Sequence, residues 1–189
     1  MIVYLHGFRS SPQSSKAQRL KAHMTARNLG PLFWCEQLPP SPRAAIALAE
    51  RQIAAARMPV TVVGSSLGGY YATHLAEKHR LKAVLVNPAV VAHLSLAEFV
   101  GPQTNLYTGE TFDFKPEYID ELRAIEVPRI SRPQDFLLLA ETGDEVLDYR
   151  QAVAKYSGAR QIVLEGGDHS FTRWDDYLDA VLEFAGVLP

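Results

Sequence analysis

A serine flanked by glycines constrains the fold of this chain more than any other feature. Residues 64–68 read Gly-Ser-Ser-Leu-Gly, between a short β-branched run at residues 59–63 and a segment with helical spacing at residues 69–79. In a strand–turn–helix setting, the pattern G-x-S-x-G holds one hydroxyl on a strained turn above a sheet. Its register makes Ser66 the candidate nucleophile. The pentapeptide alone is equally typical of a glycine-rich turn whose serines cap the helix, so the rest of the chain must supply the partners.

Short apolar runs alternate with helix-like segments along the chain. The expected strands are residues 2–5, 32–35, 60–63, 81–86, 136–140 and 161–164, and the expected helices are residues 14–28, 42–57, 69–79, 145–156 and 172–185. Strands that are apolar throughout are typical of a parallel sheet covered on both faces. We predict a three-layer α/β fold with a minimal, mostly parallel sheet of about six strands. Right-handed crossovers predict the spatial order second, first, third, fourth, fifth, sixth.

The length of the chain predicts one domain that spans residues 1–189. Residues 87–134 do not fit a single crossover helix, so we predict a small lid-like insertion after the fourth strand. Its apolar side chains either form a satellite core or line a substrate pocket, and both readings stay open. Phe99 and Phe112 are the pocket candidates.

Composition excludes several classes of function. The net charge is −2 with the signs interspersed, which predicts neither a nucleic-acid groove nor a polybasic membrane surface. We expect no signal peptide and no membrane span, and the single Cys35 fits a reducing compartment, so the predicted location is cytoplasmic. No metal-ligand spacing and no phosphate-loop lysine occur, so we predict no metal and no cofactor. The oligomeric state stays open.

Two loops after the later strands carry an acid and a base. Asp144 follows the fifth strand and His169 follows the sixth, which gives the order Ser66, Asp144, His169 that α/β-hydrolases use. His169 would accept the Ser66 proton and return it to the leaving group, while Asp144 would orient the imidazole. Four other carboxylates compete with Asp144: Glu141, Glu145, Asp148 and Asp168. Of these, Asp168 is better placed to hold the loop, whereas Glu145 and Asp148 look like residues of a first helical turn.

The loop after the first strand reads His6-Gly7-Phe8. In this architecture an oxyanion hole combines an N–H of that loop with the N–H after the nucleophile, which nominates the backbones of Phe8 and Leu67. We expect His6 to fix the loop by hydrogen bonding. The basic residues that follow, Arg9, Lys16, Arg19 and Lys21, are expected on a solvated helix face, although Arg9 could meet a negative group at the pocket mouth.

Several segments together resemble one family. They are residues 6–12, Ser15-Lys16-Ala17, residues 64–72, Asn87-Pro88-Ala89, residues 105–110 and Gly167-Asp168-His169. This set resembles the YqiA-like esterases, which are small bacterial α/β-hydrolases, and it spans essentially the whole chain. The resemblance implies the hydrolase fold, a triad at Ser66, Asp144 and His169, and esterase or thioesterase activity.

The sequence therefore predicts a serine hydrolase that cleaves a carboxylic ester or an acyl thioester through an acyl-enzyme on Ser66. Its expected partner is a small-molecule ester or thioester substrate. Two alternatives stay open: a non-catalytic binding module on the same fold, and acyltransferase or lyase chemistry.

Overall fold

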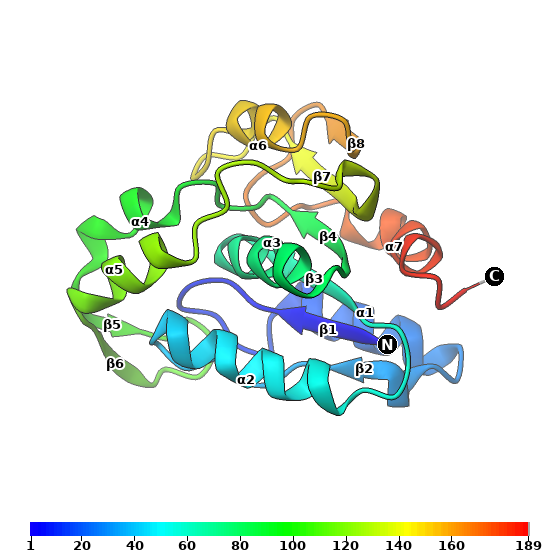
Figure 1. Ribbon diagram of the computed structural model, residues 1–189, viewed down its shortest axis with the longest axis horizontal. Coiled ribbons are helices and arrows are strands. Elements are labelled where there is room, and N and C mark those ends of the chain that lie inside the picture. Colours follow the sequence, from blue (N-terminus) through cyan, green and yellow to red (C-terminus); the bar gives the residue numbers. More distant parts are fainter. Residues whose placement is uncertain (189) are drawn as a thin grey trace.

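Six short strands form the central sheet of the computed structural model, which describes residues 1–188 (Figure 1). They are β1 (Ile2–Leu5), β2 (Phe33–Trp34), β3 (Thr61–Ser65), β4 (Lys82–Val86), β7 (Phe136–Glu141) and β8 (Arg160–Leu164). All neighbours are parallel and the order is β2-β1-β3-β4-β7-β8, which confirms the predicted topology. The chain reverses its direction of winding between β1 and β3, so the loops after these strands meet at the switch point.

Burial explains why the strands are apolar throughout. Every residue of β1, β3 and β7 is buried. One face of the sheet packs against α2 (Pro42–Ala55), α3 (Leu67–His79) and α6 (Tyr149–Lys155), and the other packs against α1 (Ser15–Ala26) and α7 (Leu178–Ala185). This is the three-layer arrangement that the pattern predicts.

Local chemistry sets the helix boundaries. Pro42 occupies the first position of α2, and the Ser41 hydroxyl accepts a hydrogen bond from the N–H of Ala44, as expected for a capped start. Short 3₁₀ turns, η1 (Gly30–Leu32), η3 (Pro133–Asp135) and η4 (Trp174–Tyr177), precede β2, β7 and α7. The predicted helix at residues 172–185 therefore begins with a 3₁₀ turn.

The predicted helix at residues 145–156 is wrong at its start, because α6 begins only at Tyr149. Asp144 Oδ1 accepts hydrogen bonds from the N–H groups of Val146 and Leu147, which folds these residues into a turn. Asp148 then caps the helix by accepting from the N–H of Arg150.

The segment between β4 and β7 has secondary structure of its own. It contains α4 (Ala92–Ser95), η2 (Ala97–Phe99), the antiparallel strands β5 (Gly101–Thr104) and β6 (Thr111–Phe114), and α5 (Glu117–Ala124). The strands form a hairpin at the left of Figure 1, beyond the end of α2. Phe114 and Leu122 bury their side chains in the same core cluster as α2 and α3.

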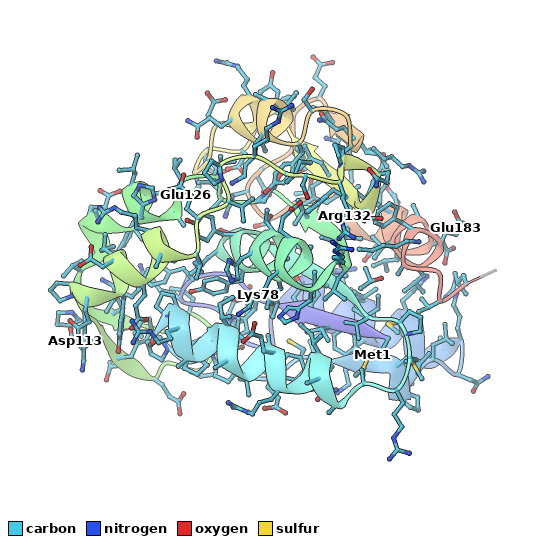
Figure 2. All side chains as sticks on the ribbon, in the orientation of Figure 1. Met1, Lys78, Asp113, Glu126, Arg132 and Glu183 are labelled. Carbon is cyan, nitrogen blue, oxygen red and sulfur yellow. The ribbon has the colours of Figure 1, made fainter. Side chains whose placement is uncertain are left out.

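Charged side chains cover the outer surface, among them Lys78 on α3, Asp113 on β6 and Glu183 on α7, all exposed (Figure 2). Within residues 1–188, every helix is too short or too polar to cross a bilayer.

Candidate active site

Ser66 lies on the sharp turn between β3 and α3, with φ of 55° and ψ of −121°. A positive φ at a residue with a side chain is strained, and the two flanking glycines allow the turn to close. A Cβ at Gly64 would clash with the carbonyl of Gly68, and a Cβ at Gly68 would clash with the carbonyl of Leu5. The Ser66 side chain makes no capping hydrogen bond to α3, so the reading of this serine as a helix cap is wrong.

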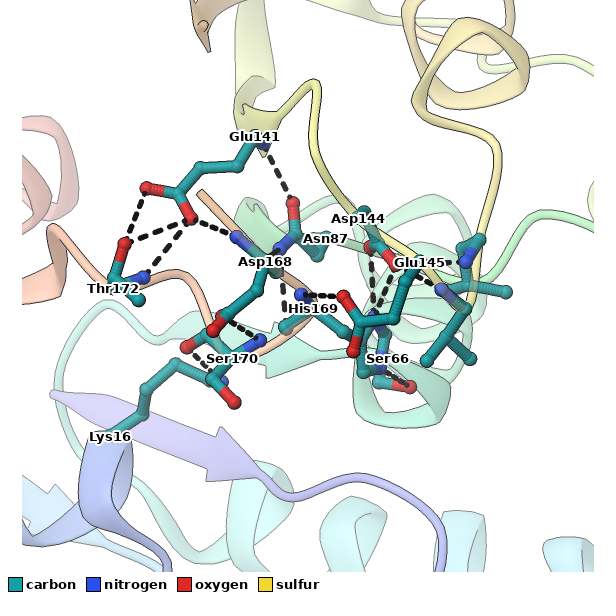
Figure 3. A network of polar contacts seen from close by, with 12 residues as sticks. Lys16, Ser66, Asn87, Glu141, Asp144, Glu145, Asp168, His169, Ser170 and Thr172 are labelled. Carbon is teal, nitrogen blue, oxygen red and sulfur yellow. Dashed lines mark hydrogen bonds and ion pairs between the residues drawn. The ribbon is translucent and has the colours of Figure 1, made fainter. Parts of the chain in front are cut away.

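Ser66, His169 and Asp144 form one chain of contacts, although they are far apart in sequence (Figure 3). Ser66 Oγ lies 3.0 Å from His169 Nε2, and His169 Nδ1 lies 2.8 Å from Asp144 Oδ2. A carboxylate accepts only, so a neutral His169 donates its Nδ1–H to Asp144 and leaves Nε2 free to accept the serine proton.

Asp144 is held as a carboxylate. Its side chain is 2% exposed. Burial by itself would raise the pKa of Asp144, but hydrogen bonds from His169 and from the N–H groups of Leu147 and Val146 outweigh burial and hold the pKa below its ordinary value. The carboxylate therefore stays a hydrogen-bond acceptor for His169 Nδ1–H.

The competing carboxylates have other contacts. Glu145 Oε2 accepts a hydrogen bond from the backbone N–H of His169 at 3.0 Å, so the prediction that Glu145 belongs to a first helical turn is wrong. Asp168 Oδ1 accepts from the N–H of Ser170, within the loop that it was expected to hold. Asp148 caps α6. Among these residues, Asp144 alone contacts the imidazole ring.

Asn87 ties the His169 loop to the sheet, and sequence reasoning gave it no role. It follows β4 with φ of 41°. Its Nδ2 donates to the backbone oxygens of Asp168 at 3.0 Å and His169 at 3.2 Å, while its Oδ1 accepts from the N–H of Glu141 at 3.0 Å. The Asn87 side chain thus links the end of β4 to the end of β7 and to the His169 loop.

Glu141 holds the same loop from the end of β7 (Figure 3). Its side chain is fully buried and accepts from the N–H groups of Asp168 and Thr172 and from Arg173 Nε at 2.8 Å. Burial would raise the pKa of Glu141, but the hydrogen bonds from Arg173, Asp168 and Thr172 hold it below the ordinary value. The carboxylate leaves no room for a side chain at Gly167, whose φ is +72°.

The His6-Gly7-Phe8 loop lies beside the nucleophile. A Cβ at Gly7 would stand 3.3 Å from Ser66 Cβ and 3.7 Å from Ser66 Oγ. The backbone N–H groups of Phe8 and Leu67 make no backbone hydrogen bond within residues 1–188. Both residues therefore leave a donor open near Ser66.

His6 fixes this loop, as expected. Its Nδ1–H donates to the carbonyl of Gly7 at 3.0 Å, and its Nε2 accepts from the N–H of Leu38 at 3.0 Å. Burial lowers the pKa of His6 to about 4, so the ring is neutral at physiological pH.

The hairpin of the insertion is hydrogen-bonded to the same loop. Arg9, with φ of 55°, donates from Nε to the carbonyl of Thr104, and its own carbonyl accepts from the N–H of Leu106 at 2.8 Å. Asn105 Nδ2 donates to the carbonyl of Ser10 at 2.8 Å. The end of β5 is therefore fastened to the residues that follow Phe8.

Two cavities lie beside the loop that follows β1, and Gly7 and Phe8 line both of them. The first, here called the Ser66 cavity, has a volume of about 400 Å³ and contains Ser66 and His169 in its wall. The second, here called the Phe112 cavity, has a volume of about 570 Å³ and is lined by Phe8, Leu67 and Phe112. Arg9 lines both cavities. Phe99 lines neither and packs its ring edge-on against Phe8, with centroids 5.7 Å apart.

In the part of the chain that the structure describes, no three His, Cys, Asp or Glu side chains gather in a group that could hold a metal ion. The single cysteine, Cys35, follows β2, and burial raises the pKa of its thiol to about 12, as suits a structural thiol.

A family model, described as Uncharacterised protein family (UPF0227), matches residues 1–186. The chain belongs to this family. It is the YqiA-like family, which confirms the resemblance read from the sequence motifs.

Solved structures with low sequence identity share the fold. A proposed hydrolase of Agrobacterium vitis S4 is 17% identical with a TM-score of 0.78, over 97% of this chain and 87% of the other. The Paleococcus ferrophilus monoacylglycerol lipase is 16% identical with a TM-score of 0.73, over 97% and 93%. The mouse alpha/beta hydrolase domain-containing protein 10 is 15% identical with a TM-score of 0.67, over 96% and 89%. These likenesses confirm the α/β-hydrolase fold.

Proposed function

We propose that this protein is a serine hydrolase that cleaves a carboxylic ester or an acyl thioester. The observation that carries the proposal is the unbroken contact from Ser66 through His169 to Asp144, at 3.0 and 2.8 Å, on a strained turn between strand and helix. A serine needs such a base to become a nucleophile at neutral pH, and the base needs an orienting acid.

The reaction follows from the geometry. Ser66 Oγ attacks the carbonyl carbon while its proton passes to His169 Nε2, and the N–H groups of Phe8 and Leu67 donate to the oxyanion. His169 then gives the proton to the leaving oxygen or sulfur, which departs and leaves an acyl group on Ser66. Water, deprotonated by His169, attacks this acyl-enzyme and releases the carboxylic acid and the free serine.

The positive φ of Ser66 supports the same reading. A strained conformation persists only where the surroundings enforce it, and the two glycines and β1 enforce it here. The turn presents the hydroxyl to His169 and keeps it from capping α3.

The test combines covalent labelling with hydrolysis. A fluorophosphonate probe should label one site, and mass spectrometry of the digest should place the label on Ser66. Ser66→Ala should lose labelling and should lower hydrolysis of 4-nitrophenyl butyrate by on the order of 10⁶-fold, with an unchanged circular dichroism spectrum.

Ser65→Ala is the matched control, because this serine adjoins the nucleophile and has the wrong register. This variant should still carry the label on Ser66. Labelling at Ser65, or turnover by Ser66→Ala at the wild-type rate, would contradict the proposal.

A further inference from the structure

The Ser66 cavity has a basic side that the proposed chemistry does not use. We propose that this side is a subsite for an anionic group, a carboxylate or a phosphate, carried by the leaving group of the substrate. The inference rests on the proposed function and names its substrate class: an ester or thioester whose alcohol or thiol part bears a negative charge.

The first turn of α1 forms one wall of the cavity. Ser14, Ser15 and Lys16 all line it. α1 has 12 residues, and no side chain caps its N-terminus. The first N–H groups of a helix have no partner within the helix, and they favour negative charge.

Ser14 provides an independent sign of a ligand. The residue is 7% exposed and lines the cavity, yet its Oγ has no hydrogen-bond partner within residues 1–188. A buried hydroxyl without a partner is costly, and most such groups in folded proteins are paired. The hydroxyl itself is closed off from the cavity in this conformation, so the Ser14 side chain would have to turn toward the cavity to donate to an anionic oxygen at the end of α1.

Lys16 adds a cation at the same place. The prediction that it lies on a solvated helix face is wrong, because its side chain is partly buried and its Nζ donates to the carbonyl of Ser170 at 2.8 Å (Figure 3). In the described part of the chain, no carboxylate lies within ion-pair distance of it. Burial lowers its pKa to about 8, against the opposing effect of Asp168, Asp144 and Glu141, so the ammonium is charged at neutral pH.

The other two cations of the cavity differ in their pairing. Arg19 already forms an ion pair with Asp175 and donates to Ser15 Oγ, so it balances a charge of the protein itself. Arg9 has no carboxylate partner within residues 1–188, and its one side-chain hydrogen bond uses Nε. Its two terminal nitrogens can therefore bind an anion together with Lys16.

The reaction decides which half of the substrate enters this cavity. His169 must hand its proton to the leaving atom, so that atom lies next to His169 Nε2. His169 lines the Ser66 cavity and not the Phe112 cavity. The leaving group thus occupies the Ser66 cavity with its charge toward α1, and the acyl group occupies the more apolar Phe112 cavity.

The test compares two esters that differ in one charge: 4-butyryloxybenzoate, and the neutral methyl ester of the same compound. The measured quantity is the ratio of their kcat/KM values, in which the common steps on Ser66 and His169 cancel. Lys16→Met should lower the ratio of anionic to neutral substrate at least tenfold, and Ser14→Ala should lower it severalfold. Lys21→Met is the matched control, because Lys21 is an exposed lysine of the same helix, and this variant should keep the ratio.

An equal loss for both esters in Lys16→Met would overturn the proposal, because Lys16 would then act only by holding the His169 loop through Ser170. A second measurement does not depend on hydrolysis. Ser66→Ala should bind 4-hydroxybenzoate more tightly than methyl 4-hydroxybenzoate by calorimetry, and Lys16→Met should abolish the difference.

The same calorimetry separates the two ideas. If the protein binds 4-hydroxybenzoate more tightly than the methyl ester but hydrolyses no ester, the hydrolase proposal is overturned and the anion subsite is supported. If it hydrolyses esters but binds the two compounds equally, the anion subsite is overturned and the hydrolase proposal is supported. Inorganic phosphate that binds as tightly as 4-hydroxyphenyl phosphate would indicate a site for free anions and would contradict a leaving-group subsite.

Discussion

The carboxylate of Asp144 has both a structural and a proposed catalytic role. One oxygen, Oδ1, contacts the N–H groups of Val146 and Leu147 as well as His169, so the same carboxylate shapes the turn before α6 and orients the imidazole. An asparagine at this position could still accept the hydrogen bonds that shape the turn, but it would not orient the imidazole as a carboxylate does. One substitution therefore tests the catalytic role of Asp144 without removing its structural role.

We expect Asp144→Asn to keep the fold and to lower kcat by on the order of 10⁴-fold, because an amide N–H facing His169 Nδ1 would place the imidazole proton on Nε2. Asp148→Asn is the control, since Asp148 caps α6 and does not contact His169. Steady-state kinetics with 4-nitrophenyl butyrate measure both. Near-wild-type kcat in Asp144→Asn would reopen the choice among the carboxylates.

The sequence located Ser66, Asp144 and His169 because each follows a strand of a parallel sheet, and the ends of such strands converge at one edge. Their catalytic roles stay predictions. Asn87 and Glu141 could not be found in this way, since their contacts depend on which backbone groups of the His169 loop turn inward. A polar residue at the end of a buried strand, as at both positions, was the available signal.

At the scale of elements, the His169 loop is held by side chains from two adjacent strands. Asn87 follows β4 and Glu141 ends β7, and both reach the backbone of residues 168–172. The loop thus takes its position from the rigid centre of the sheet. Boundaries that depend on such local bonds, as at the start of α6, were the part of the secondary structure that the periodicity predicted wrongly.

Glu141→Gln should lower the free energy of unfolding by about 2 kcal/mol, because it removes the charge from the buried acceptor of Arg173, whose own side chain is partly exposed to water. The depressed pKa of Glu141 stabilises the fold above the pKa of an unfolded glutamate, and this contribution disappears as the pH falls through the folded value. Wild type should therefore lose more stability than Glu141→Gln between neutral and acid pH.

Urea denaturation at a series of pH values measures this difference. Glu165→Gln, an exposed carboxylate of the same loop, should follow wild type throughout. Parallel pH profiles for wild type and Glu141→Gln would show that the ion pair with Arg173 contributes nothing to folding.

At the scale of the whole molecule, the substrate would lie between the parallel sheet and the inserted hairpin. Phe8, Phe112 and Phe114 pack together across this boundary, with centroids of Phe8 and Phe114 5.0 Å apart. The sequence left open whether the insertion is a satellite core or a pocket wall. Phe114 packs in the main core cluster together with α2 and α3, while Phe99 and Phe112 pack against that cluster and Phe112 also lines a cavity. A role of Phe112 in binding the substrate stays a prediction.

The rate should depend on acyl length through the Phe112 cavity. We expect kcat/KM for 4-nitrophenyl esters to rise about fourfold per methylene, from roughly 0.8 kcal/mol each, and then to level off or fall when the cavity is full. Phe112→Ala should move the optimum to longer chains, and Phe99→Ala should keep it. A profile without an optimum, or the same optimum in Phe112→Ala, would place the acyl group elsewhere.

The hydrogen bonds between the hairpin and the loop after Phe8 carry a consequence for protein engineering. Hydrogen bonds join residues 104–106 of the hairpin to residues 9–10 of the loop that would bind the oxyanion. A library of variants in the hairpin would therefore change the turnover rate as well as the substrate selectivity. Grafting a hairpin from a relative would succeed only if residues 9–10 and 104–106 move together as one cassette. Changes confined to the tip beyond Leu106 would alter the choice of substrate while the catalytic loop keeps its place.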